Sequence, residues 1–358
     1  MKPDRIDDTD PRRWQEPGAY EVVPGIYRIP LPMPDAGLRT VNVYVLEGDD
    51  GLTLVDAGWA QEESWARLGE ALATLSRSVA DIRSVLVTHV HKDHYSQGPR
   101  LRRETGCRLG LGAGERPSLE YMYAGTDRGG ERFEYLRRHG AVELARRLAE
   151  ARFGEAEDPA LWEPPDEWIA DGRTFQVGRT GLRAMHTPGH TQGHLVYVGE
   201  NRNVLFTGDH VLPHITPSLG LERRTGALPL RDYLDSLRAV EALPDLMMLP
   251  AHGPVRSTTH YRVAELLQHH RERLDACESL LDTRPVPALE VARGLPWTRR
   301  RRRFEDLNDF NQLLAVSETV AHLDLLVLWG RCVREETTAG VRYHRLPVDR
   351  AARLPAHR

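Results

Sequence analysis

The stretch Thr88-His89-Val90-His91-Lys92-Asp93-His94 decides how this chain of 358 residues is interpreted. It places imidazole and carboxylate groups close together, and these are the ligands that borderline divalent metals prefer. The mostly apolar segment 84–87 comes directly before it, so the ligands begin where a buried strand is expected to end. Layered α/β proteins usually place their ligand sites at such strand ends. We therefore expect a metal site here.

Four shorter motifs elsewhere in the chain supply side chains of the same kind. They are Leu54-Val55-Asp56-Ala57-Gly58, His186-Thr187-Pro188-Gly189-His190, Phe206-Thr207-Gly208-Asp209 and Pro250-Ala251-His252-Gly253. The three downstream motifs are expected at strand ends or tight turns, where glycine lets the backbone approach a site closely. A carboxylate such as that of Asp209 can bridge two cations with its two oxygens. Together the motifs can fill a two-metal site.

Composition places the chain among globular proteins and argues against several classes. The hydrophobic fraction is 40% and the charged fraction 28%. No apolar run approaches the roughly 18 residues of a membrane span, and residues 1–17 lack the apolar stretch of a signal peptide. A net charge of −4 gives no general attraction to nucleic acid. Cys107, Cys277 and Cys332 are far apart, so we expect no disulfide framework and a cytoplasmic location.

The pattern of elements predicts three parts of the chain. A polar segment, 1–19, precedes a catalytic domain, 20–255, in which strands alternate with the candidate ligands, and residues 115–165 form a helical insertion without a ligand motif. Residues 256–358 form a C-terminal domain. Its expected elements are helices over about 258–281, 288–293 and 310–329 and a hairpin over 331–344. Three helices followed by a hairpin is the order of a winged-helix module.

The motifs in this order resemble those of the metallo-β-lactamase-fold hydrolases, a family marked by His-x-His-x-Asp-His. The resemblance covers about residues 20–255 and implies a four-layer αββα sandwich. It implies seven metal ligands, namely His89, His91 and His190 for one ion, Asp93, His94 and His252 for a second, and Asp209 between them. Asp56 matches the family's aspartate that braces the histidine segment through hydrogen bonds. The C-terminal part resembles the winged-helix-like tail of LACTB-like relatives.

The resemblance also implies a hydrolytic mechanism. The commonest zinc β-lactamases carry cysteine where this chain has Asp209, so the glyoxalase II, lactonase, ribonuclease and thioesterase branches are favoured. We expect a hydroxide that bridges two divalent ions, with Asp93 and Asp209 as catalytic residues. Zinc is the first expectation, and iron and manganese accept the same mixture of nitrogen and oxygen ligands.

A thioester or related acyl ester is the expected substrate, with coenzyme A, a carrier protein or glutathione as the thiol. The alternatives are a single-strand endoribonuclease and a lactonase. A ligand-binding regulator without catalysis is disfavoured, because a binder need not keep all seven ligands. The expected partner is therefore a small acyl molecule. A membrane is not expected, nucleic acid is not favoured, and a homodimer stays open.

Residues that contact the substrate are harder to assign. His210 and His214 lie on the segment that leaves the site, where they either touch substrate or are held by local hydrogen bonds. Tyr121 and Tyr123 either line a pocket or belong to the core of the insertion. The run Arg299–Arg303 suits the phosphates of RNA or of coenzyme A, but a solvated loop is the favoured interpretation.

Overall fold

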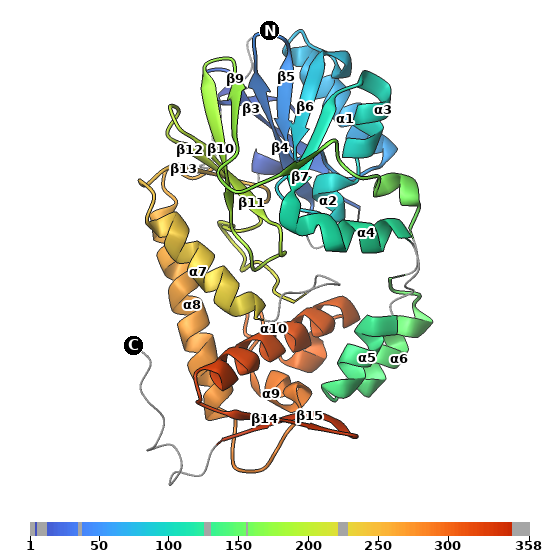
Figure 1. The fold of residues 1–358 in the computed structure, drawn as a ribbon, viewed down its shortest axis with the longest axis vertical. Helices are drawn as coiled ribbons and strands as arrows, with labels where there is room; N and C mark the ends of the chain where they lie inside the picture. The colour runs from blue at the N-terminus through green and yellow to red at the C-terminus, as the bar shows by residue number, and fades with distance from the viewer. Residues whose placement is uncertain are drawn as a thin grey trace. The chain divides into compact units, whose positions relative to one another are not determined.

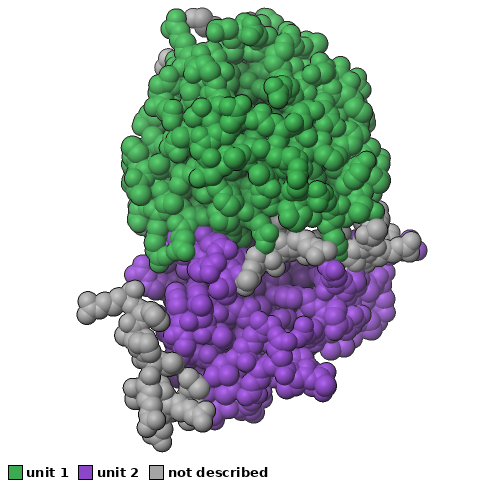
Figure 2. Space-filling model, in the orientation of Figure 1, with its two compact units in different colours: residues 1–125, 157–217, 235–264 green, residues 126–156, 218–234, 265–358 purple. Residues whose placement is uncertain are grey.

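The computed structural model describes residues 4–5, 13–34, 38–124, 130–154, 157–220 and 228–345. The chain forms two compact units, shown in green and purple in Figure 2. The first contains residues 1–125, 157–217 and 235–264, and the second contains residues 126–156, 218–234 and 265–358. The division predicted at residues 19 and 255 stays a prediction, and parts of its outer segments (1–3, 6–12 and 346–358) lie outside the described residues.

The first unit contains an eight-stranded sheet in chain order (Figure 1). Its strands are β1 (Asp4–Arg5), β2 (Tyr20–Val23), β3 (Ile26–Pro32), β4 (Thr40–Glu47), β5 (Leu52–Val55), β6 (Ile82–Leu86), β7 (Arg108–Gly112) and β8 (Glu167–Ile169). Strands β2 to β5 pair antiparallel. Strands β5 to β8 pair parallel, so helices connect them.

Helices cover one face of this sheet. They are α1 (Glu62–Thr74), α2 (Lys92–Tyr95), α3 (Gly98–Thr105) and α4 (Arg116–Ala124). Helix α1 shows why they pack there, because Leu68 and Leu72 recur at helical spacing and are both fully buried. They join a core with Val43 and Val85 of the sheet. Strand β6 ends at Leu86, so the histidine segment begins just beyond a buried strand, as predicted.

A second, five-stranded sheet packs against the opposite face of the first. In spatial order its strands are β13 (Met247–Pro250), β12 (Val204–Gly208), β11 (Leu195–Gly199), β10 (Thr180–His186) and β9 (Thr174–Val177). The core between the sheets combines Tyr44 of β4 with Phe206 of β12, whose rings meet edge to face at 5.3 Å. Helix α7 (Pro229–Glu241) connects β12 to the parallel strand β13. The predicted α/β sandwich is confirmed.

The second unit is largely helical. Its elements include α5 (Gly130–Arg138), α6 (Val142–Glu150), α9 (Ala288–Gly294), α10 (Asp309–Leu328), β14 (Val333–Thr337) and β15 (Gly340–His344), and α8 (His260–Ser279) begins in the first unit and continues into it. The expected order of helices and hairpin is observed, but its assignment as a winged helix stays a prediction. Helices α4, α5 and α6 lie within residues 115–165, and the assignment of that segment as an insertion stays a prediction. No helix in the described segments is long and apolar enough to cross a membrane.

Short 3-10 turns complete the described elements. They are η1 (Arg13–Gln15), η2 (Val79–Asp81), η3 (Ala113–Glu115), η4 (Pro159–Leu161) and η5 (Phe304–Asp306).

Buried polar bonds tie the two sheets together at one edge. The side-chain amide of Asn42 donates to the carbonyl oxygens of Pro250 at 2.9 Å and Gly253 at 2.8 Å. The hydroxyl of Tyr44 donates to the same Pro250 oxygen at 2.9 Å. Strand β4 of the first sheet therefore fixes the turn that follows β13 and carries His252.

We expect Asn42→Ala to destabilise the protein by about 2 kcal/mol, because it leaves the buried Gly253 carbonyl without this donor. Tyr44→Phe is the matched control and should cost about half as much, since Asn42 still donates to Pro250. Urea unfolding of the three proteins measures the difference. Equal stability of Asn42→Ala and wild type would show that these bonds do not hold the turn.

Candidate metal centre

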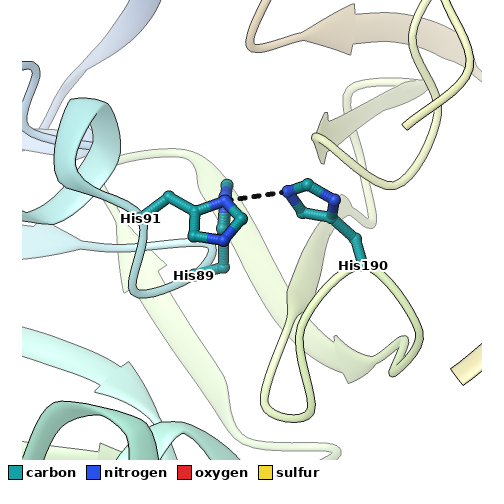
Figure 3. Close-up of side chains that lie close together, drawn as sticks. All are labelled: His89, His91 and His190. Carbon is teal, nitrogen blue, oxygen red and sulfur yellow. Dashed lines mark hydrogen bonds between the residues drawn. The ribbon is translucent and has the colours of Figure 1, made fainter. Parts of the chain in front are cut away.

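Three imidazole rings from two sheets converge in the first unit (Figure 3). His89 and His91 follow β6, and His190 lies on the turn between β10 and β11. The Nδ1 atom of His91 lies 3.0 Å from Nε2 of His89 and 3.0 Å from Nε2 of His190. One nitrogen from each ring can approach a common point, so these residues could hold one metal ion.

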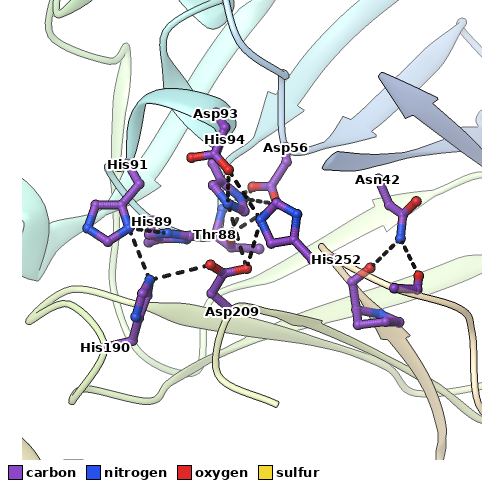
Figure 4. Close-up of polar contacts among 12 residues, drawn as sticks. Asn42, Asp56, Thr88, His89, His91, Asp93, His94, His190, Asp209 and His252 are labelled. Carbon is purple, nitrogen blue, oxygen red and sulfur yellow. Dashed lines mark hydrogen bonds and ion pairs between the residues drawn. The ribbon is translucent and has the colours of Figure 1, made fainter. Parts of the chain in front are cut away.

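A second group of side chains lies beside the first (Figure 4). The Oδ2 atom of Asp93 lies 3.2 Å from Nε2 of His252 and 3.4 Å from Nε2 of His94. The carboxylate of Asp209 faces both groups. Its Oδ2 lies 3.5 Å from Nε2 of His190, and its Oδ1 lies 3.4 Å from Nε2 of His252. All seven residues that the resemblance named are thus brought together.

The donor atoms of this cluster suit a divalent cation. The Nε2 atoms of His94 and His252 and the Oδ1 atom of Asp209 are buried, form no hydrogen bond within the described residues, and lie close to one another and to the Asp93 carboxylate. Buried polar atoms normally have hydrogen-bonding partners, and a cation held among these atoms would satisfy all three. Imidazole nitrogen and carboxylate oxygen together fit zinc, and also iron and manganese.

Hydrogen bonds outside the cluster orient its rings. The Nδ1–H of His94 donates to Oδ2 of Asp56 at 2.9 Å, and the Nδ1–H of His252 donates to the carbonyl oxygen of Thr40 at 2.8 Å. Both rings therefore direct Nε2 into the cluster. Asp56 also accepts the backbone N–H of Thr88 at 2.7 Å on its other oxygen. The bracing contacts expected of Asp56 are present.

Carboxylates and burial set the charge state of the histidines. Burial lowers the pKa of His94, but the carboxylates of Asp93, Asp56 and Asp209 outweigh burial and hold that pKa well above its usual value. The pKa of His252 is also raised, because Asp209 and Asp93 outweigh its burial. Burial and the neighbouring imidazoles hold the pKa of His89 well below its usual value. Without a metal, the neighbouring carboxylates therefore favour the protonated forms of His94 and His252.

The four predicted substrate-contacting residues have diverse environments. His210 is fully buried beside His194, with ring centroids 6.0 Å apart, and burial lowers its pKa to about 3. His214 is half-buried, with its Nε2 3.4 Å from Nη2 of Arg256. Tyr121 is half-buried and Tyr123 is 46% exposed, both on α4. Their contacts with substrate stay a prediction.

His194 is a fully buried residue that lies outside the ligand motifs. Its Nε2 accepts the backbone N–H of Asp209 at 3.2 Å, so its proton lies on Nδ1, which is 3.0 Å from the hydroxyl oxygen of Thr187. Its ring stacks on His89 with centroids 5.1 Å apart. A Cβ at Gly208 would lie 2.7 Å from His194 Nε2, so glycine is required for this approach. His194 therefore fixes where Asp209 begins.

Glu115 is a second residue that the sequence did not reveal. It is the last residue of η3, the turn that follows β7, and it is fully buried. Its carboxylate accepts a hydrogen bond of 2.5 Å from the hydroxyl of Thr191, the residue next to His190. A Cβ at Gly193 would lie 2.1 Å from the backbone nitrogen of Glu115. The bond between Glu115 and Thr191 depends on the close approach that Gly193 allows. It joins residues 76 positions apart, so no local sequence pattern predicts it.

Comparison with known proteins establishes the family. The family model of the metallo-beta-lactamase superfamily matches residues 36–252, and this chain belongs to that superfamily of metallo-hydrolases. A probable metallo-hydrolase of Bacillus subtilis (strain 168), YqjP, is 27% identical over 303 residues, covering 84% of this chain and 90% of the relative. A crystal structure of a beta-lactamase domain protein from Burkholderia ambifaria has a TM-score of 0.77 and 28% identity, and covers 92% of this chain and 93% of that one.

One relative has a more specific name, but its match covers a smaller part of both proteins. The atrochrysone carboxyl ACP thioesterase of Aspergillus fumigatus is 28% identical over 262 residues, or 73% of this chain. The match spans 49% of that protein, so this chain covers about half of its length.

Metal binding is expected to release protons, because His94 and His252 have raised pKa values and must lose their protons to coordinate. Affinity for zinc should therefore rise with pH, and the rise should extend above the usual pKa of histidine because both pKa values are raised. Calorimetry in buffers of different ionisation enthalpy counts the released protons, and His94→Asn should release fewer. An affinity that does not change with pH would contradict this assignment.

Replacing His194 should weaken metal binding without removing a ligand. We expect His194→Ala to lower zinc affinity by about 10- to 100-fold, the usual effect of losing a residue that orients a ligand. Thr187→Val should also weaken zinc binding, because it removes the hydroxyl that contacts His194. Thr187→Ser should bind zinc like the wild type, since serine keeps the hydroxyl. The absorption spectrum of the cobalt-substituted proteins reports ligand geometry directly. Identical spectra and affinities across the series would show that His194 only fills space.

Proposed function

We propose that this protein is a two-metal hydrolase that cleaves thioesters or related acyl esters. The observation that supports it most is the position of Asp209. Its two carboxylate oxygens approach His190 of one group and His252 of the other at 3.5 and 3.4 Å. A carboxylate shared between two ligand groups is suited to two cations held close together.

The proposal gives each side chain a role. His89, His91 and His190 would hold one ion, Asp93, His94 and His252 would hold the other, and Asp209 would be shared. Two divalent ions, zinc by first expectation, would supply Lewis acidity and lower the pKa of water to about 7. The chain fixes the ligand directions through Asp56, Thr40 and His194, so the groups do not have to reorganise during the reaction.

Asp93 is the candidate for proton transfer. Its side chain is 14% exposed, compared with 3% for Asp56, so it is the more accessible carboxylate. Burial raises its pKa, but His94 and His252 outweigh burial and hold the pKa well below the usual value. An ionised Asp93 can accept a proton from the attacking water and pass it to the leaving thiolate sulfur.

The substrate class is supported by the named relative and by the chemistry. A thioester carbonyl is attacked by water, and the thiol departs without needing a serine or cysteine nucleophile. The similarity to an ACP thioesterase makes a carrier-protein or coenzyme A thioester the first candidate, with glutathione thioesters next. Cys107, Cys277 and Cys332 are free and buried, which supports a reducing cytoplasm as the location.

Asp209→Ala should reduce the metal content from about two ions per chain and abolish thioester turnover, because both groups lose their common carboxylate. His89→Ala should also lose turnover. Asp275→Ala is the matched control, since that aspartate is exposed and pairs with Arg331. Metal analysis and thiol release measured with a chromogenic reagent give the two readouts. A metal-free Asp209→Ala protein that retains turnover would rule out the metal-dependent mechanism.

A substrate panel separates the proposed activity from its alternatives. The purified, metal-loaded protein is assayed with an acyl-coenzyme A, an acylated carrier protein, a glutathione thioester, a lactone and a single-stranded RNA. We expect turnover of at least one thioester, and Asp93→Asn should lower kcat more than it changes KM. Cleavage of the RNA or the lactone alone would overturn the thioesterase assignment.

A further inference from the structure

The most basic segment of the chain forms an ordered turn in the second unit. Residues 297–303, called here the arginine turn, contain five consecutive arginines in a chain whose net charge is −4. Trp297 and Arg302 pair as an antiparallel bridge, with backbone hydrogen bonds of 2.8 and 2.7 Å. The N–H of Arg301 donates to the carbonyl of Thr298 at 3.0 Å. Backbone hydrogen bonds therefore hold both the base and the tip of the arginine turn.

A buried anchor holds the base of the arginine turn. The ring of Trp297 is 7% exposed, and its Nε1–H donates to the carbonyl oxygen of Ala292 at 2.8 Å. The guanidinium of Arg273 lies 3.9 Å from the centroid of the same ring and also donates to Pro296 at 2.8 Å. Phe304, just beyond the turn, is buried as well. The arginines thus project from a fixed support.

The charges of the arginine turn are not neutralised within the described protein. All five arginine side chains are exposed. Only Arg303 approaches a carboxylate, with its Nη2 3.7 Å from Glu305, while Arg299, Arg300, Arg301 and Arg302 form no ion pair with a described residue. Elsewhere in this unit, arginines such as Arg147 and Arg331 bond acidic neighbours. The expected solvated loop is thus exposed but ordered, which suits an anionic partner.

The surroundings favour an acidic protein over other anions. Small ligands are usually enclosed, with about 70–90% of their surface buried, whereas these side chains are exposed. Single-stranded nucleic acid is usually bound by basic groups combined with exposed aromatic rings, but the rings of Trp297 and Phe304 are buried. Several arginines on an exposed turn match the rim of an electrostatically steered protein interface.

We propose that the arginine turn docks an acidic carrier protein that delivers the acyl thioester. This inference rests on the proposed thioesterase function and specifies its partner. The turn binds the acidic surface of the carrier domain, and the acyl group that the carrier bears is the substrate of the metal centre. No covalent step is added.

The test uses charge reversal in the full-length, metal-loaded protein. Arg299→Glu with Arg300→Glu is compared with a control pair, Arg179→Glu with Arg271→Glu. The control arginines are also exposed and form no ion pair with a described residue, so the total charge changes equally. Arg299→Lys with Arg300→Lys keeps the charge and should restore most of the binding.

Binding of an acetylated acyl carrier protein is measured by calorimetry, and turnover is measured with that protein and with the small acetyl thioester of N-acetylcysteamine. We expect the arginine-turn reversal to raise both Kd and KM for the carrier protein by about 10- to 100-fold, with stronger effects at low salt. The small thioester should keep its kcat and KM, which also verifies folding.

The outcomes separate this inference from the function on which it rests. Cleavage of neither thioester by the wild type contradicts the proposed function, while calorimetry still tests docking by itself. Weakened carrier binding in the arginine-turn variant alone supports docking. Equal effects of the two charge reversals, or no effect of either, overturn it. Tighter binding of a single-stranded RNA than of the carrier protein, lost in the same variant, overturns it in favour of nucleic acid.

Discussion

The carboxylate of Asp56 is the interaction on which the site depends. It accepts the backbone N–H of Thr88 on one oxygen and the Nδ1–H of His94 on the other, so it spans the beginning and end of the histidine segment. Its own backbone has a φ of 65°, a left-handed conformation that aspartate tolerates better than most residues. Burying a carboxylate is costly unless hydrogen-bond donors surround it, so Asp56 depends on its donors staying in place. Asp56 therefore links the end of β5 to the ligands after β6.

Two glycines allow the close contacts that position the ligands of the second sheet. Gly208 lets His194 reach the backbone N–H of Asp209, and Gly193 lets Glu115 reach the turn that carries His190. Neither position tolerates a Cβ without a shift of the backbone or of a buried ring. The ligands consequently owe their positions to close packing as much as to their own bonds.

Local patterns predicted much of this protein. Apolar spacing located α10, and the five motifs named every side chain of the cluster, because each motif carries its signal within a few residues. His194 and Glu115 lacked such a signal, since their importance comes from partners on distant segments. The arginine run was obvious in sequence, but its ordered backbone depends on the burial of Trp297. Contacts made through tertiary structure explain what sequence alone did not supply.

The cluster takes His89, His91, Asp93 and His94 from the end of one sheet and His190, Asp209 and His252 from the other. The packing of Tyr44 against Phe206 therefore sets the distance between the two halves of the site. A slip of one residue along a strand displaces its ligand by about 3.3 Å, more than the tolerance of a coordination bond. The core residues between the sheets thus fix the spacing of the metal ligands, although they are not ligands themselves.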